Sequence, residues 1–414
     1  MRFLHTSDWH LGQTLHNFDR TYEHQCFLDW LLDTIDSEQA EAVLICGDIF
    51  DNANPSAASQ KQLYHFLRQA RSRTPHLNII LIAGNHDSPG RLEAPGPLLD
   101  AQGVAVVGHV TRGPDSQIDL ERLVLPLKNR RGEIAAWCLA IPFLRPGDVP
   151  RVENALDPYM EGIALLYRQA LGLALAKRQP GQAILALGHC HMVEGRISAE
   201  SERRIVIGGS EALSSAIFDP AIAYAALGHL HLAQNVGGQT RLRYCGSPLP
   251  MSFSEIGYAH QILRIDLDGE AVADIAAIPV PRAVELLRVP ARPGPVDEVL
   301  ALLAALDQLP APSCHQTAPY LEVRVRLDAP EPGLRTRIEA ALHGKPVRLV
   351  KIETTRTAGD AGDAIALSLD QLEQLQPDDV FRRLYLQRFG NEAPEEQLTA
   401  FAELLLAASD QAAV

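Results

Sequence analysis

Gly228-His229-Leu230-His231 directly follows the apolar run 223–227, and this stretch decides how the rest of the sequence is interpreted. A short apolar run that ends at a glycine is typical of a buried strand. Side chains two residues apart lie on the same side of an extended backbone, so His229 and His231 would present two imidazoles together. Strand ends are where ligands and catalytic groups collect in open α/β sheets. Taken alone, a His-x-His pair is more often an ordinary surface or core feature than a metal site.

Four other segments repeat this arrangement of an apolar run followed by a polar cluster. In chain order the clusters are Asp8-Trp9-His10, Gly47-Asp48-Ile49-Phe50-Asp51, Gly84-Asn85-His86-Asp87 and Gly188-His189. Glycine ahead of a cluster lets the backbone turn sharply and approach a ligand closely. Asp, His and Asn supply oxygen and nitrogen donors that suit Mn, Mg, Zn or Fe. Any one cluster is also compatible with a simple turn, but five in order favour one shared site.

The order of these blocks resembles the calcineurin-like metallophosphoesterases, whose signature is Asp-x-His, Gly-Asp-x-x-Asp, Gly-Asn-His-Asp, Gly-His and Gly-His-x-His. Three longer stretches narrow the resemblance to the SbcD family, the nuclease subunits of bacterial SbcCD complexes. These stretches are HTSDWHLG at 5–12, AIPFLRP at 140–146 and RYCGSPLP at 243–250. Beyond about residue 280 the resemblance rests on the pattern of elements rather than on motifs.

Strands and helices alternate in the first two thirds of the chain, which predicts an α/β fold. Helical patterns cover 20–35, 56–71 and 158–177, and hairpins are expected at 123–141 and 262–280. This order fits two sheets packed face to face between helices. The family resemblance implies the same two-sheet metallophosphoesterase sandwich.

Prolines at 281 and 290–295 punctuate the chain and mark a boundary. We predict a nuclease domain at 1–280, a small α/β capping domain at 281–357 and a linker with C-terminal helices at 358–414. In the family that the chain resembles, the second part helps to orient DNA and the third docks on the coiled-coil base of the SbcC ATPase. Five basic side chains of the second part could face phosphate or merely cover a solvated sheet: Arg324, Arg326, Arg348, Lys351 and Arg356.

The composition bounds the function. The chain has 414 residues, 46% of them hydrophobic, which allows two or three domains with sizeable cores. Its net charge of −14 lacks the basic footprint expected of a nucleic-acid enzyme, although residues 358–414 alone hold 11 acidic side chains against three arginines. We therefore expect a partner that supplies further phosphate contacts. No uncharged window is long enough for a spanning helix or a signal peptide, which predicts a cytoplasmic protein. The six scattered cysteines predict buried thiols rather than disulfides or a zinc site.

Carried over block by block, the resemblance implies two divalent ions per chain, with Mn expected and Mg possible. One ion would be held by Asp8, His10, Asp48 and His231, and the other by Asp48, Asn85, His189 and His229. Asp48 is the bridge, because its two oxygens can bind both cations. His191 repeats the His-x-His spacing beside His189 and stays open as an alternative ligand.

The resemblance also implies three catalytic candidates beside the ligands. His86 would contact the phosphate and protonate or stabilise the leaving oxygen, and Asp87 would orient the ring of His86. Asp51 is the third candidate, at a position where archaeal and eukaryotic relatives tend to carry histidine.

The function implied is a two-metal DNA nuclease. Coupled to an SbcC-type ATPase it would act as an ATP-dependent exonuclease on duplexes and an endonuclease on single strands or hairpins, as a homodimer within a heterotetramer, in DNA repair and recombination. One alternative is another metallophosphoesterase, such as a phosphatase or cyclic-nucleotide phosphodiesterase, which would not need the added C-terminal third. A non-catalytic DNA-end scaffold is the other alternative, and intact ligands argue against it.

Overall fold

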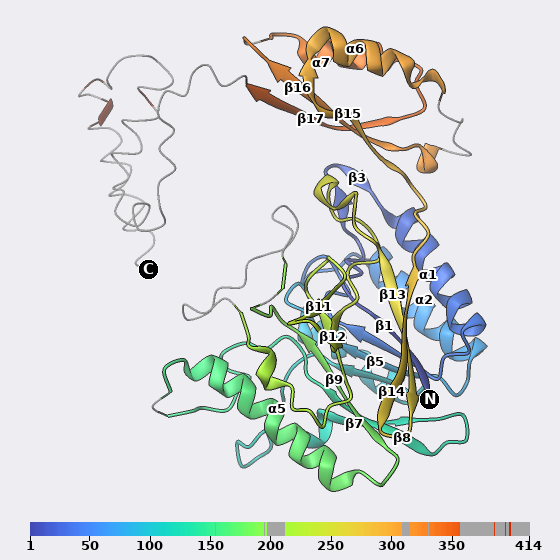
Figure 1. Ribbon diagram of the computed structural model, residues 1–414, viewed down its shortest axis with the longest axis vertical. Helices are drawn as coiled ribbons and strands as arrows, with labels where there is room; N and C mark the ends of the chain where they lie inside the picture. Colours follow the sequence, from blue (N-terminus) through green and yellow to red (C-terminus); the bar gives the residue numbers. More distant parts are fainter. Residues whose placement is uncertain are drawn as a thin grey trace. The chain divides into compact units, whose positions relative to one another are not determined.

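Two six-stranded sheets packed face to face form the body of the molecule in this computed structural model (Figure 1). The structure describes residues 1–153, 155–193, 195–196, 212–308, 315–329 and 331–356, and the isolated positions 385, 394, 397 and 398. Residues Met1–Thr355 make up one compact unit and Arg356–Val414 a second. The helices predicted within 358–414 lie outside the described residues, and the predicted domain boundaries stay predictions.

The first sheet is mainly parallel. Its strands are β1 (Arg2–Thr6), β4 (Ala42–Cys46), β5 (Asn78–Ile82), β6 (Val104–Val107), β13 (Gln261–Asp268) and β14 (Ala271–Pro279). In the order β14-β13-β1-β4-β5-β6, the four strands from β1 to β6 run parallel, while β13 pairs antiparallel with both of its neighbours. The predicted hairpin at 262–280 is therefore β13–β14.

The second sheet is also mainly parallel. Its strands are β7 (Val124–Lys128), β8 (Ile134–Ala140), β9 (Ala183–His189), β10 (Tyr224–Gly228), β11 (Gln234–Val236) and β12 (Gln239–Tyr244). In the order β11-β12-β10-β9-β8-β7, the central four strands are parallel and the two edge strands are antiparallel to them. A small ribbon of β2 (Thr14–Leu15) and β3 (Phe18–Asp19) stands apart from both sheets. The predicted two-sheet sandwich is confirmed.

Helices cover the outer faces of the sandwich. Figure 1 shows α1 (Thr21–Ser37) and α2 (Ala57–Arg73) together on one side of the sheets and α5 (Pro158–Lys177) on the other. Two short helices, α3 (Pro89–Glu93) and α4 (Gly96–Asp100), and the 3-10 turns η1 (Leu120–Arg122), η2 (Ser215–Ile217) and η3 (Phe253–Glu255) complete the body. The three long helices match the predicted ranges to within two residues.

Alternation along the strands divides the core into two layers. Val43 and Ile45 of β4 pack toward α1 and α2, whereas Leu44 and Cys46 of the same strand face the second sheet. This is the period of two expected of a strand that is buried on both faces. Trp9 lies in the helix-facing layer, fully buried against Phe27, as expected of a packing residue.

A third, smaller sheet follows the body. Its elements are β15 (Leu286–Pro295), α6 (Val296–Ala304), η4 (Ala305–Gln308), η5 (His315–Thr317), β16 (Tyr320–Leu327), α7 (Leu334–Ala341) and β17 (Arg348–Arg356). We call these elements the three-stranded unit. The strand order is β15-β16-β17, and both helices pack on the face of β16 that carries Leu321, Val323 and Val325.

The sequence pattern predicts a strand at 284–289 for the three-stranded unit, and the structure corrects where this strand ends. The prolines at 290–295 do not end its first strand, because β15 continues past a register shift between Val289 and Gly294. As an edge strand, β15 tolerates residues without an N–H. Arg348 fits neither of the alternatives left open for it, because it is buried, donates to the Ala318 carbonyl and stacks 3.9 Å from the Tyr320 ring centroid.

Two more of the five basic side chains are paired with acids. Arg324 bonds to Glu353 and Lys351 lies 3.4 Å from Glu322. These pairs favour a solvated sheet face over a phosphate-binding patch. The five cysteines in the described part of the chain are free thiols. Among the described residues, no helix combines the length and apolarity needed to cross a membrane.

His5 ties the two sheets together through their shared core. Its Nε2 lies 3.1 Å from the Leu227 carbonyl oxygen of β10, and its Nδ1 lies 3.0 Å from the Tyr224 hydroxyl. A carbonyl can only accept, so Nε2 carries the proton and Nδ1 accepts from Tyr224. Burial lowers the pKa of His5 to about 3, despite the hydrogen bond to Leu227, so the ring is neutral near pH 7.

This buried ring predicts a component of acid sensitivity. In the unfolded chain His5 titrates near its ordinary pKa of 6.5, so below that pH the unfolded state binds a proton that the folded state refuses until about pH 3. The free energy of unfolding should then fall by up to about 1.4 kcal/mol per pH unit from this residue alone. His5→Gln keeps a side chain that donates and accepts but removes the titration. Urea unfolding at pH 6.5 and 4.5 in chelator should show the smaller loss in the variant, and equal losses would contradict the assignment.

Candidate metal centre

The five polar clusters meet where strands of both sheets end. Asp8, Asp48 and Asn85 follow β1, β4 and β5 of the first sheet, while His189 ends β9 and His229 follows β10 of the second. β1, β4 and β5 are mutually parallel, and so are β9 and β10, so each sheet presents its carboxyl ends along one edge. Packing of the sheets brings the two edges together.

Glycine is required where these edges approach most closely. A Cβ added to Gly228 would lie 1.9 Å from the Cys46 carbonyl oxygen, and one added to Gly84 would lie 2.1 Å from Asp48 Oδ1. Neither position has room for a side chain. The glycines that precede the polar clusters therefore allow the close approach that the sequence predicted.

The backbone of the site is strained as well as crowded. Four of its residues adopt left-handed φ angles, a region that side chains other than glycine rarely enter at a cost of about 1–3 kcal/mol each. They are Asp8 (55°), His10 (47°), Asp48 (49°) and His229 (102°). Strain of this kind persists only where surrounding contacts hold the turn, and here it aims side chains inward.

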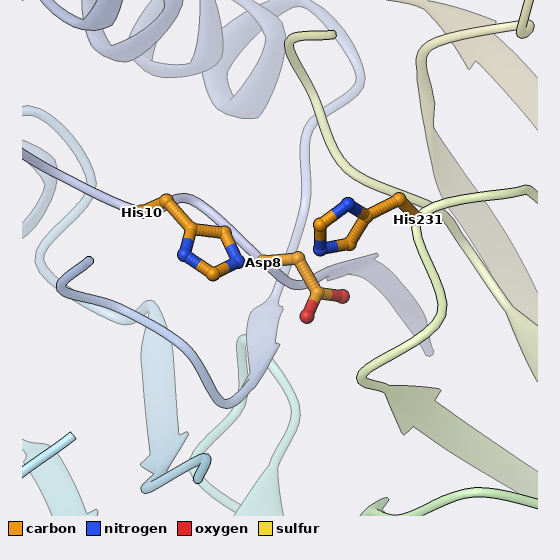
Figure 2. A group of neighbouring side chains, drawn as sticks. All are labelled: Asp8, His10 and His231. Carbon is orange, nitrogen blue, oxygen red and sulfur yellow. The ribbon is translucent and has the colours of Figure 1, made fainter. Parts of the chain in front are cut away.

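Asp8, His10 and His231 form a first group of potential ligands. Their ligand atoms all lie within 4.8 Å of one another, and Figure 2 shows Asp8 between the two imidazoles. The Asp8 carboxylate is oriented by the Ser7 hydroxyl at 2.5 Å and by the backbone N–H of His229, which lies 3.0 and 3.2 Å from its two oxygens. The turn after β10 therefore positions a carboxylate that follows β1.

Asp48, His189 and His229 form a second group with the same spacing. Asn85 joins it, since its Oδ1 lies 2.9 Å from His189 Nε2 and 3.1 Å from His229 Nδ1. Asp48 also reaches the first group: its Oδ2 lies 3.5 Å from His189 Nε2 and 3.6 Å from His10 Nε2. One carboxylate oxygen thus stands between the two groups, in the grouping that the sequence predicts.

The imidazoles of His10, His189 and His231 are each oriented by a contact at Nδ1. In each, Nδ1 lies against an acceptor oxygen of the protein, which places the proton on Nδ1 and leaves Nε2 with a lone pair directed at the centre. The acceptors are Asp51 Oδ1 for His10 at 3.4 Å, the Cys46 carbonyl for His189 at 2.8 Å and Glu255 Oε1 for His231 at 2.9 Å. Metal-binding histidines are oriented in this way.

The donor atoms fit divalent cations better than they fit one another. His10 Nε2 is buried without a hydrogen-bond partner in the described part of the chain. In a neutral His189 with its proton on Nδ1, Asn85 Oδ1 and His189 Nε2 are both acceptors 2.9 Å apart, so either a cation or a second ring proton must lie between them. Buried lone pairs that converge without a donor are costly unless a cation lies among them. Carboxylate, amide and imidazole donors suit Mn, Mg or Zn.

Electrostatics support the same view. Burial would raise the pKa of Asp48, but the neighbouring His189 outweighs burial and holds it well below its usual range. Burial would lower the pKa of His189, and the Asp48 carboxylate instead raises it to about 9, so a proton occupies Nε2 when no cation does. For His229 burial prevails, and its pKa falls well below normal. The carboxylate at the centre therefore favours positive charge beside it.

Comparison with known proteins agrees with this arrangement. Residues 1–233 match the family model described as calcineurin-like phosphoesterase, and residues 282–389 match one described as type 5 capsule protein repressor C-terminal domain. The chain is 41% identical over 362 residues to the SbcD subunit of nuclease SbcCD from Rhodobacter capsulatus, covering 86% of this chain and 88% of that protein. It is 31% identical over 410 residues to the SbcD subunit of nuclease SbcCD from Escherichia coli K12, covering 96% of each.

The chain belongs to the SbcD family. A further member, the SbcD subunit of nuclease SbcCD from Bacillus subtilis, is 34% identical over 275 residues, covering 64% of this chain and 66% of that protein. Family membership and the phosphoesterase match make the chain a metal-dependent phosphodiesterase of the nuclease type, as the sequence predicted. Divalent metal use follows from the same domain.

His86 and Asp51 lie beside Asp48 and His10. The His86 backbone N–H donates to Asp48 Oδ1 at 2.9 Å, and the ring Nδ1 lies 2.7 Å from the Asp51 carbonyl oxygen. His86 also forms a third potential ligand group with His10 and Asp48, so the structure places it nearer the centre than the sequence implied. Asp51 contacts both histidines: its carboxylate lies against His10, and its backbone carbonyl lies against His86.

Asp87 differs from the expectation that it orients the His86 ring. Its buried carboxylate accepts backbone N–H bonds from Ile49 at 3.1 Å, Phe50 at 2.9 Å and Gly84 at 2.9 Å. Burial, reinforced by Asp48, raises the pKa of Asp87 to about 6 despite these bonds. Asp87 therefore joins the turn after β4 to the turn after β5.

Glu255 is the site residue that sequence reasoning missed. It is fully buried and belongs to none of the five blocks, and a single glutamate in a loop carries no pattern that points to a histidine 24 residues away. His191, the open alternative, has its ring centroid 6.3 Å from that of His229. The described groups of potential ligands contain His189 and not His191.

The contacts of Asp87 predict a loss of stability when its charge is removed. In Asp87→Asn the amide nitrogen must face at least one backbone N–H, which leaves a buried donor unsatisfied at a cost of about 1–3 kcal/mol. Urea unfolding in chelator should show this loss, while the exposed Asp115→Asn should show almost none. A variant of normal stability with slow cleavage would instead support action through the His86 ring.

Proposed function

We propose that the chain is a two-metal DNA nuclease. The observation that carries this proposal is the set of three imidazoles whose Nδ1 atoms are engaged and whose Nε2 atoms point to one centre spanned by Asp48. The first ion is assigned Asp8, His10, Asp48 and His231, and the second is assigned Asp48, Asn85, His189 and His229. Mn is the proposed metal, with Mg as the alternative.

Bound ions would supply a nucleophilic water of lowered pKa and stabilise negative charge on the attacking and leaving oxygens. The protein's own part is positioning. The Asp51 carbonyl holds the His86 ring through Nδ1, so Nε2 is the atom assigned to the phosphate and the leaving oxygen. Asp87 acts at a distance by holding together the turns that carry Asp48 and His86.

The substrate is proposed to be DNA ends and hairpins, and the partner an SbcC-type ATPase. The relatives are named as one component of a nuclease called SbcCD, which supports an assembly of this kind. The net charge of −14 supports it as well, because a chain so acidic gains little DNA affinity from its own surface. Residues 358–414 are proposed to dock on the partner, and residues 281–357 to orient DNA. The assembly is proposed to be a heterotetramer that contains a homodimer of this chain and is located in the cytoplasm. Duplex exonuclease activity would depend on ATP through the partner.

The test is a cleavage assay on linear duplex, hairpin and circular single-stranded DNA with Mn or Mg, with and without the co-expressed ATPase. Asp48→Asn should bind fewer than two Mn per chain and lose cleavage, because both ions share the carboxylate. A variant with two ions and a normal rate would overturn the ligand assignment. Hydrolysis of phosphomonoesters without any DNA cleavage would instead support the phosphatase alternative.

His86→Ala separates proton transfer from metal binding. If His86 protonates the leaving oxygen, its loss should lower cleavage by about 10²- to 10⁴-fold with two Mn still bound. The deficit should shrink on an activated aryl phosphodiester, whose leaving group needs little protonation. The exposed His65→Ala serves as the matched control. Loss of one ion would make His86 a ligand, as its place near His10 and Asp48 allows, and an equal deficit on both substrates would indicate that it holds the phosphate.

A further inference from the structure

The segment Leu249–Glu255 contacts the metal centre at one end. Glu255 is fully buried, with Oε1 2.9 Å from His231 Nδ1 and Oε2 accepting the Met251 backbone N–H at 2.7 Å. Both oxygens are therefore engaged, one by a potential ligand and one by the backbone of its own segment. The position of the carboxylate, and with it the His231 ring, depends on where this segment lies.

The same segment contacts the three-stranded unit. Phe253 is buried in a small cluster with Leu286 and Tyr320, which belong to β15 and β16. Arg288 of β15 donates from Nη2 to the Phe253 carbonyl oxygen at 2.9 Å. The residue two positions before Glu255 is thus held by the three-stranded unit through both its side chain and its backbone.

A buried guanidinium holds the middle of the segment. Arg20 is fully buried and donates from Nη1 to the Pro250 carbonyl at 2.6 Å and to Gln13 Oε1 at 2.7 Å. Gln13 in turn donates to the Met251 carbonyl at 3.0 Å. Arg20 is paired with Glu23, whose Oε1 accepts the hydroxyl of Tyr320 from the three-stranded unit at 2.9 Å. Three carbonyl contacts, at 250, 251 and 253, therefore fix the path of the segment.

We propose that Glu255 is a positioning residue for His231, and that docking of the three-stranded unit through Phe253 and Arg288 sets that position. This inference rests on the proposed two-metal site and adds a dependence that the ligand assignment does not contain. The first group, which includes His231, is sensitive to how the three-stranded unit docks. Among the contacts described for the segment Leu249–Glu255, none is to Asn85, His189 or His229 of the second group.

Chemistry makes Glu255 difficult to replace even by its amide. In Glu255→Gln, an oxygen directed at His231 leaves an amide nitrogen facing the Met251 N–H, which is also a donor. The opposite orientation directs the amide nitrogen at His231 Nδ1, which must then accept and carry its proton on Nε2, the atom needed by a cation. Either orientation disturbs the first group. Loss of such a histidine partner typically weakens metal affinity about 10- to 100-fold.

The experiment titrates Mn²⁺ into the full chain by calorimetry after chelator treatment. His231→Ala and His189→Ala identify which binding step belongs to which group. In Glu255→Gln the step assigned to the first group should weaken about 10- to 100-fold while the second stays within about threefold. The exposed Glu133→Gln is the matched control, and Glu255→Asp, whose shorter side chain cannot satisfy both contacts, replaces the variant if Glu255→Gln fails to fold.

The docking part is tested by Arg288→Met and Phe253→Leu. Arg288→Met removes one hydrogen bond to the segment, and Phe253→Leu removes part of its apolar contact with Leu286 and Tyr320. Each should weaken the first binding step roughly fivefold. Arg335→Met, which alters an exposed pair on α7, should change neither step. Thermal unfolding of each variant separates a shift in one binding step from general loss of structure.

The outcomes distinguish this inference from the proposed function. Fewer than two Mn bound by the unaltered chain would contradict the two-metal proposal itself. Two Mn bound by the unaltered chain and unchanged affinities in the Glu255 variants would overturn the positioning role. A weakened first step in the Glu255 variants, with both docking variants unchanged, would overturn the link to the three-stranded unit. Parallel weakening of both steps would reduce Glu255 to a general structural role and also overturn the proposal.

Discussion

The approach of two sheet edges to within reach of one carboxylate is the constraint on which this molecule depends. Asp48 lies between His10 and His189 only because the turns after β4, β5 and β10 meet without side chains at Gly84 and Gly228. That approach requires a rigid sandwich, because a shift of even about one ångström would separate the two groups. The buried His5 contributes to this rigidity by bonding across the shared core to β10. Packing far from the site thus determines the geometry at its centre.

Desolvation gives the site its chemical character. The carboxylates of Asp8 and Asp48 and the rings of His10, His189 and His231 are withdrawn from water. A fold that buries so many acceptors has to offset their desolvation, and a cation does so more effectively than a proton. Left-handed φ angles at Asp8, His10, Asp48 and His229 add to the cost. The folded chain is therefore less stable locally, but its carboxylate oxygens and imidazole nitrogens are held in fixed positions around one centre.

The sequence pattern points to those candidate ligands that follow an apolar run directly or within a few residues. Each predicted ligand sits at the end of an apolar run, usually behind a glycine, and parallel strand ends then bring the ligands together without further information. Asp87 and Glu255 follow no such rule, because a buried carboxylate can support a turn or an imidazole from any loop that reaches it. The elements of the fold also differ in how well the sequence predicts them. Helix α5 begins and ends at the predicted residues, whereas β15 passes through prolines that only an edge strand tolerates. The sequence left the role of Arg348 open because its contacts come from residues distant in the sequence.

The division of donor atoms between the sheets has a final physical consequence. The first sheet contributes Asp8, His10, Asp48 and Asn85 from its strand ends, and the second contributes His189, His229 and His231. Each group of ligands draws on both sheets, so an ion bound in either group would join them. Because a cation so held binds the folded sandwich and not the unfolded chain, occupancy and folding become linked by mass action. An ion bound in either group would therefore help to hold the two sheets together, and replacing one of its ligands would alter their packing as well as the chemistry.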